Sequence, residues 1–158
     1  MKALSEQERL LLIVEAVRYC KKVRGLGMPP GSYTKALREP VFFLWERYGK
    51  KKNQAARYCS ESYLGIPAGP HAHVYDHAIP FKIVQESLLS IGNPDPDSVK
   101  NILQNKLVAC FITKDEDRLL TSLGLGSRMP ANADESDCLA RYAFAGIKVL
   151  PNPAYISD

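Results

Sequence analysis

The chain has 158 residues and a formal net charge of +4, and 46% of its residues are apolar, as in an ordinary globular protein. No stretch approaches about 18 uninterrupted apolar residues, and the N-terminus lacks the basic start and apolar run of a signal peptide. We therefore expect one cytoplasmic domain without a membrane span.

The charge is unevenly distributed along the chain. Residues 1–70 contain 13 Lys or Arg against 6 Asp or Glu, a balance of +7, whereas residues 71–158 contain 8 against 11, a balance of −3. A basic part attracts phosphates and an acidic part can hold a hard cation, although a solvated surface would give the same counts. We expect a basic helical part over about 1–65, an acidic part with the histidines over about 66–150, and a mobile tail over 151–158.

Helical patterns dominate the basic part. Ser5 and Glu8 form a capping box that predicts a helix to about Val23, followed by a Gly- and Pro-rich loop. Pro40 suits the first turn of a second helix to about Tyr48, and a short helix is expected over Gln54–Tyr63.

Lys50, Lys51 and Lys52 lie between these two helices. Three consecutive lysines often form only a solvated turn, but they are also the best candidates here for contacts with phosphates of a nucleic acid. We expect such contacts to grip the backbone without reading bases.

The acidic part mixes helices with a strand. An amphipathic helix is expected over Phe81–Leu89, a second helix from Ser98 to about Gln104, and a buried strand over Leu107–Ile112. Thr113 and Glu116 form a second capping box, which opens a helix to about Leu123. The sequence predicts an α+β fold, mostly helical, with a small strand element that carries an Asp-His motif. Cys20 and Cys110 fall in apolar patterns and are expected to be core thiols, and no Cys-x-x-Cys pair indicates a zinc ribbon.

All three histidines of the chain, His71, His73 and His77, lie within seven residues. Histidine is the side chain most used for metal ligation and for proton transfer near neutral pH. Asp76 precedes His77, so a carboxylate for a cation and an imidazole for activating water are adjacent in the sequence.

The segment Asp76-His77-Ala78-Ile79-Pro80 resembles the opening motif of the HNH (His-Me finger) nucleases, in which Asp-His or Glu-His is followed by two apolar residues and Pro. The resemblance implies that Asp76 binds Mg²⁺ or Mn²⁺, that His77 is the general base, and that the chain cuts phosphodiester bonds of nucleic acid. A nuclease of this size could also act as a homodimer, which would let it reach both strands. Asp117 stands where the family has a last His on a helix, and that His is absent here. The resemblance implies that Asp117, or Asp115, holds the metal ion together with Asp76. Arg128, in a Gly-flanked loop, could stabilise charge on the phosphate.

Two alternatives remain open at this point. His71, His73 and His77 could together hold zinc; their spacing is similar to the motif of metallo-β-lactamase-like hydrolases but is one residue longer. In the other alternative, His71 and His73 are loop residues and His77 is a core residue. The protein would then be a non-catalytic interaction or regulatory module that binds another protein or a nucleic acid.

Overall fold

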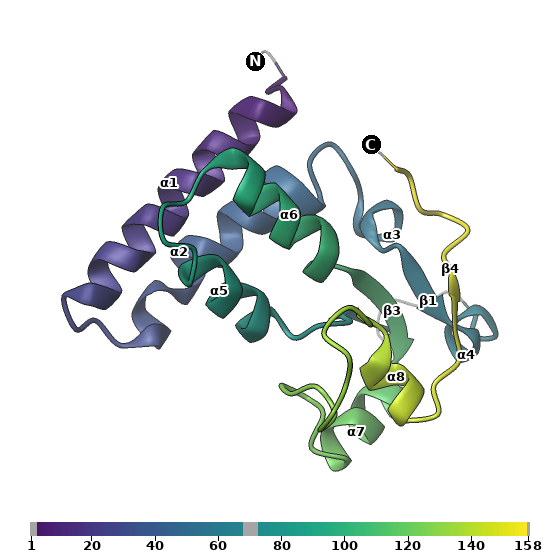
Figure 1. Cartoon of the computed structure of the whole chain (residues 1–158). Helices are drawn as coiled ribbons and strands as arrows, with labels where there is room; N and C mark the ends of the chain where they lie inside the picture. Colours follow the sequence, from purple (N-terminus) through teal and green to yellow (C-terminus); the bar gives the residue numbers. More distant parts are fainter. Residues whose placement is uncertain (1–2, 68–72, 158) are drawn as a thin grey trace. The chain divides into compact units, whose positions relative to one another are not determined.

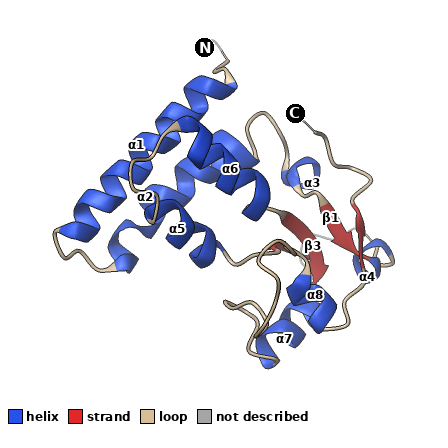
Figure 2. Ribbon diagram, viewed as in Figure 1, coloured by secondary structure: helices blue, strands red, loops and turns tan. Residues whose placement is uncertain are grey.

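The computed structural model of the chain describes residues 3–67 and 73–157. The chain divides into two compact units, Met1–Gly49 with Phe81–Gln104 and Lys50–Pro80 with Asn105–Asp158. The segment after Pro80 thus belongs to the same unit as the N-terminal helices. Among the described residues, all strands lie in the second unit, and the first unit is helical (Figures 1 and 2).

The first unit packs helices around an apolar core. Its elements are α1 (Glu6–Gly25), α2 (Pro30–Val41), the π-helix η1 (Phe42–Glu46), α5 (Phe81–Leu89) and most of α6 (Pro96–Lys106). The capping box predicted for α1 is confirmed, since Glu8 N–H donates to Ser5 Oγ at 3.2 Å and Ser5 N–H donates to the Glu8 carboxylate at 2.7 Å. The fully buried core residues of this unit include Leu10, Ile13, Val14, Val17, Leu37, Val84, Leu88 and Leu103.

The prediction that the second helix begins at Pro40 is wrong. The helix begins at Pro30, and Pro40 lies near its C-terminal end, where the chain continues into η1. Both prolines fit a start signal by themselves, because Pro lacks the N–H that is unsatisfied in the first turn of any helix. The burial of Tyr33 and Leu37 shows why the earlier start is stable: the first turns of α2 contribute to the core.

The second unit contains a four-stranded mixed sheet in the order β2-β3-β1-β4. The strands are β1 (Tyr58–Ser60), β2 (His73–His77), β3 (Ala109–Thr113) and β4 (Val149–Pro151). β3 is antiparallel to β2 and parallel to β1, and β4 is antiparallel to β1. The α+β class predicted from the sequence is confirmed, and β2 is the strand that carries the Asp-His motif.

Short helices surround this sheet: α3 (Lys52–Ala55), α4 (Glu61–Leu64), α7 (Lys114–Ser122) and α8 (Ala140–Phe144). The predicted helix over Gln54–Tyr63 is wrong in its middle, where β1 replaces it. The cause is tertiary, because Cys59 and Ser60 are fully buried and β1 pairs with β3, about fifty residues away along the chain. The predicted start of α7 is confirmed, with Thr113 as its N-cap.

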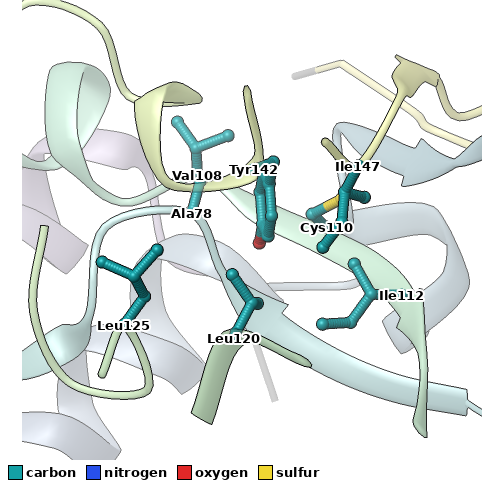
Figure 3. Close-up of a cluster of buried hydrophobic side chains, with 8 residues drawn as sticks. All are labelled: Ala78, Val108, Cys110, Ile112, Leu120, Leu125, Tyr142 and Ile147. Carbon is teal, nitrogen blue, oxygen red and sulfur yellow. The ribbon is translucent and has the colours of Figure 1, made fainter. Parts of the chain in front are cut away.

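One face of the sheet is covered by an apolar cluster that includes residues of β3, α7 and α8. Its members, drawn in Figure 3, are Ala78, Val108, Cys110, Ile112, Leu120, Leu125, Tyr142 and Ile147. We call these residues the core cluster, and the sheet face beneath them the core face. Cys20 and Cys110 are fully buried, as predicted.

The C-terminal segment is tied to the second unit by hydrogen bonds. The Asn152 amide donates to the carbonyl oxygens of Asn53 at 2.9 Å and Ala56 at 2.7 Å, and Ile156 N–H donates to the Gln54 carbonyl at 3.0 Å. Within the described residues, no helix is both long and apolar enough to cross a membrane.

Candidate functional site

Asp76 is held from the core face by two side chains of α8. Its Oδ2 atom accepts hydrogen bonds from the Tyr142 hydroxyl, at 2.7 Å, and from the Arg141 guanidinium, with which it forms an ion pair. Arg141 is only 1% exposed and also donates to the carbonyl oxygens of His77, at 2.6 Å, and Leu125, at 2.9 Å. Arg141 therefore joins the end of β2 to α8 and to the loop after α7.

The charge on Asp76 is set by opposing effects. Burial raises the pKa of its carboxyl above the ordinary value, while the Arg141 cation and the Tyr142 hydrogen bond lower it less strongly. His77 and Asp117 also lie near enough to affect Asp76: the charge of His77 lowers the pKa of the Asp76 carboxyl, and the Asp117 carboxylate raises it. Burial, followed by the charge of Asp76, raises the pKa of Tyr142, so its hydroxyl stays protonated and donates.

The side chains of His77 and Asp76 lie on opposite faces of β2. Successive side chains of a strand alternate between its two faces, and β2 keeps a regular antiparallel register to its end, with Asp76 opposite Cys110 and His77 opposite Ala109. The Asp76 side chain accordingly reaches the core cluster, whereas the His77 ring contacts Tyr75, with ring centroids 5.7 Å apart. The two residues are adjacent in sequence, but their side chains do not share one face of the sheet.

The acidic residues at the start of α7 have different environments. Asp115 is exposed and pairs with Arg118 at 3.0 Å, one helical turn away. Asp117 is half-buried on the helix that covers the core face, near Asp76. Glu116 has a structural role in the cap of α7, because its carboxylate accepts hydrogen bonds from Thr113 N–H at 2.8 Å and from Ser60 Oγ at 2.6 Å.

The Asp76 carboxylate is already paired with a cation. The carboxylate faces a buried guanidinium whose positive charge opposes a second cation at the same place. Among residues 3–67 and 73–157, no three His, Cys, Asp or Glu side chains are grouped so that they could hold a metal ion. Of the predicted zinc ligands, His71 lies outside the described residues. His73 is half-buried, and its Nδ1 atom is buried without a hydrogen-bond partner in the described structure.

The remaining predicted residues lie at the surface. Lys51 and Lys52 are exposed, Lys50 is half-buried, and Arg128 is exposed in the loop after α7. The Lys52 ammonium lies 5.9 Å from the centre of the Tyr75 ring on β2, and that of Lys50 lies 5.8 Å from the Tyr155 ring. Lys52 therefore lies beside β2, the strand that carries His73 and His77.

The face of the sheet opposite the core cluster carries a row of rings that sequence reasoning missed. His73 contacts Tyr63 with centroids 4.5 Å apart, and Tyr63 stacks on Phe111 at 5.1 Å. Phe111 contacts Tyr75 at 5.3 Å, and Tyr75 contacts His77. We call these five side chains the aromatic row. Rings at alternate positions 73, 75 and 77 were a signal for it, because such positions share a strand face.

Comparisons with protein-family models, with curated proteins and with solved structures found no match for this chain.

Proposed function

We propose that this protein binds nucleic acid without cutting it, and that the run Lys50–Lys52 contacts the phosphate backbone. The observation that carries the proposal is the position of Lys52, whose ammonium lies 5.9 Å from the Tyr75 ring on the aromatic side of the sheet. A basic run that includes the exposed Lys51 and Lys52, beside partly exposed rings, combines the charge and the flat apolar surface that nucleic acids require.

The environment of Asp76 supports a role in folding rather than in catalysis. Its carboxylate is bound to Arg141 and Tyr142, and His77 lies on the other face of β2. A general base and a ligand that act on one phosphate must converge on it. The Asp-His motif here instead anchors the end of β2 to α8.

The test is the salt dependence of binding to a labelled oligonucleotide, measured by fluorescence anisotropy. A variant with Lys50, Lys51 and Lys52 all changed to Gln should bind more weakly, and the slope of log K against log salt should become shallower by about 2 to 3. The matched control changes three other exposed lysines, Lys35, Lys82 and Lys114, to Gln and so removes the same charge. Equal losses in both variants, or no binding by the native protein, would contradict the proposal.

Metal-dependent cleavage is the second candidate. It is favoured by the order β2, β3, α7, which brings the carboxylate of Asp117 close enough to Asp76 to raise its pKa. The HNH resemblance implies this pairing of a strand end with a following helix. The experiment incubates the protein and a His77→Ala variant with single-stranded DNA, duplex DNA and RNA, in Mg²⁺, in Mn²⁺ or in EDTA. The leading proposal expects intact substrates throughout; cutting that EDTA stops and that His77→Ala loses would establish the nuclease instead.

A further inference from the structure

The two faces of the β2–β3 pair differ in how they are covered. On the core face, Cys110 and Ile112 of β3 are fully buried beneath α7 and α8. On the other face, all five members of the aromatic row are only half-buried, including the central residue of β3, Phe111. A contiguous set of partly exposed rings is typical of a binding surface rather than of a packed interior.

The row is continuous and internally supported. Tyr63 and Phe111 are nearly parallel, with an angle of 15° between their planes, and Tyr75 meets Phe111 edge-on at 78°. Tyr63 comes from α4, Phe111 from β3 and Tyr75 from β2, so three elements fix the rings in place. Rings that are already ordered lose little conformational entropy when a ligand stacks on them.

Positive charge lies at the side of this row. Lys52 contacts the Tyr75 ring through its ammonium group, and Lys51 and Lys50 precede it directly. Two carboxylates of the same unit are used elsewhere: Glu116 is bonded within the α7 cap, and Glu61 pairs with Lys148 at 2.6 Å. The ligand that complements this surface has flat apolar rings and regularly spaced negative charges.

We infer that the aromatic row binds single-stranded nucleic acid, with unpaired bases stacked on Tyr75 and Phe111 and with the phosphates contacted by Lys50–Lys52. The inference rests on the proposed function and adds the kind of strand that is bound. In a duplex the faces of the bases are stacked on one another and are inaccessible, whereas unpaired bases can stack on aromatic side chains. Stacking is tolerant of sequence, since every base has a π face.

The experiment compares binding of a labelled single strand of about 12 nucleotides with binding of the same strand annealed to its complement. Tyr75→Leu should weaken binding of the single strand by about tenfold, because Leu retains apolar volume but has no π face. Tyr75→Phe keeps the ring and should bind like the native protein. The matched control is Phe144→Leu, since Phe144 is 64% exposed on α8 and lies outside the row.

The outcomes separate this inference from the proposed function. If the duplex binds as tightly as the single strand and Tyr75→Leu changes neither affinity, the inference fails, but the proposed contact of Lys50–Lys52 with phosphates still stands. If no nucleic acid binds, both fail. If Tyr75→Leu does not fold, the native protein can be photo-crosslinked to a bromouridine-substituted single strand instead. Crosslinks in peptides that contain Tyr75 or Phe111 would support the inference. Crosslinks confined to other peptides would overturn it.

Discussion

Asp76 and Arg141, 65 positions apart in the chain, form an ion pair in which the guanidinium is 1% exposed. The pair joins β2 to α8 across the core cluster, and Figure 3 shows Tyr142, which donates to the same carboxylate, among the apolar side chains of that cluster. The carboxylate that the sequence suggested as a metal ligand is thus the counter-ion of a buried cation.

Removing the carboxylate should strongly destabilise the fold. Asp76→Ala leaves Arg141 buried without its counter-ion, so the free energy of unfolding, measured by urea denaturation, should fall by about 3–5 kcal/mol. The control is Asp115→Ala, which breaks the exposed pair with Arg118 and should cost less than about 1 kcal/mol. Equal effects of the two substitutions would show that the buried pair does not stabilise the second unit.

The same carboxyl gives a pH dependence of definite sign. Burial raises the folded-state pKa of Asp76 above its ordinary value of 3.8, so the folded protein holds this proton more tightly than the unfolded chain. As pH rises through the interval between the two values, the unfolded chain loses the proton first, and the contribution of Asp76 to the free energy of unfolding falls. The free energy of unfolding of the native protein minus that of Asp76→Asn, measured from about pH 3 to about pH 6, should therefore decrease as pH rises. A difference that increases would mean that Arg141 outweighs burial.

Local signals predicted the element boundaries that depend on neighbouring residues. The capping boxes at Ser5 and at Thr113 were readable because each depends on two residues three positions apart, and both helices begin there. The fully buried Cys110 and Ile112 likewise follow from an apolar run rich in β-branched residues. In these places the local preference and the tertiary structure agree.

Features that depend on distant pairing were not predictable from one sequence. β1 is only three residues long and exists because β3 and β4 lie on either side of it. Arg141 carried no local sign that its partner is Asp76. The adjacency of Asp76 and His77 suggested one shared site, but strand alternation separates their side chains, and this becomes certain only when the register of β2 is known.

The four thiols should differ in reactivity. Burial raises the pKa of Cys110 to about 12, so at pH 8 only about one Cys110 thiol in ten thousand is ionised, and the thiolate is the reactive form. Burial raises the pKa values of Cys20, Cys59 and Cys138 as well, but Cys20 and Cys59 are buried whereas Cys138 is half-buried and therefore more accessible to a reagent. Alkylation of the native protein with iodoacetamide, followed by mass spectrometry, should modify Cys138 first. Cys138→Ser should remove this fast reaction, and Cys110 reacting as fast as Cys138 would contradict the buried position of β3.

The cap of α7 should contribute more to the free energy of unfolding than a single hydrogen bond does, because it links the start of α7 to β1. Thr113 Oγ1 accepts from Glu116 N–H at 3.2 Å, while the Glu116 carboxylate accepts from Thr113 N–H and from Ser60 Oγ on β1. Thr113→Ala should lower the free energy of unfolding by about 1–2 kcal/mol, measured by urea denaturation.

Thr121→Ala is the matched control for this cap. Thr121 is exposed, its hydroxyl donates to the Asp117 carbonyl within the same helix at 3.0 Å, and Ala has the higher helix propensity. The control should therefore be close to neutral. If Thr113→Ala is equally neutral, the hydrogen bond from Ser60 to Glu116 stabilises the first turn of α7 without the threonine hydroxyl. Ser60→Ala should then lower the free energy of unfolding instead.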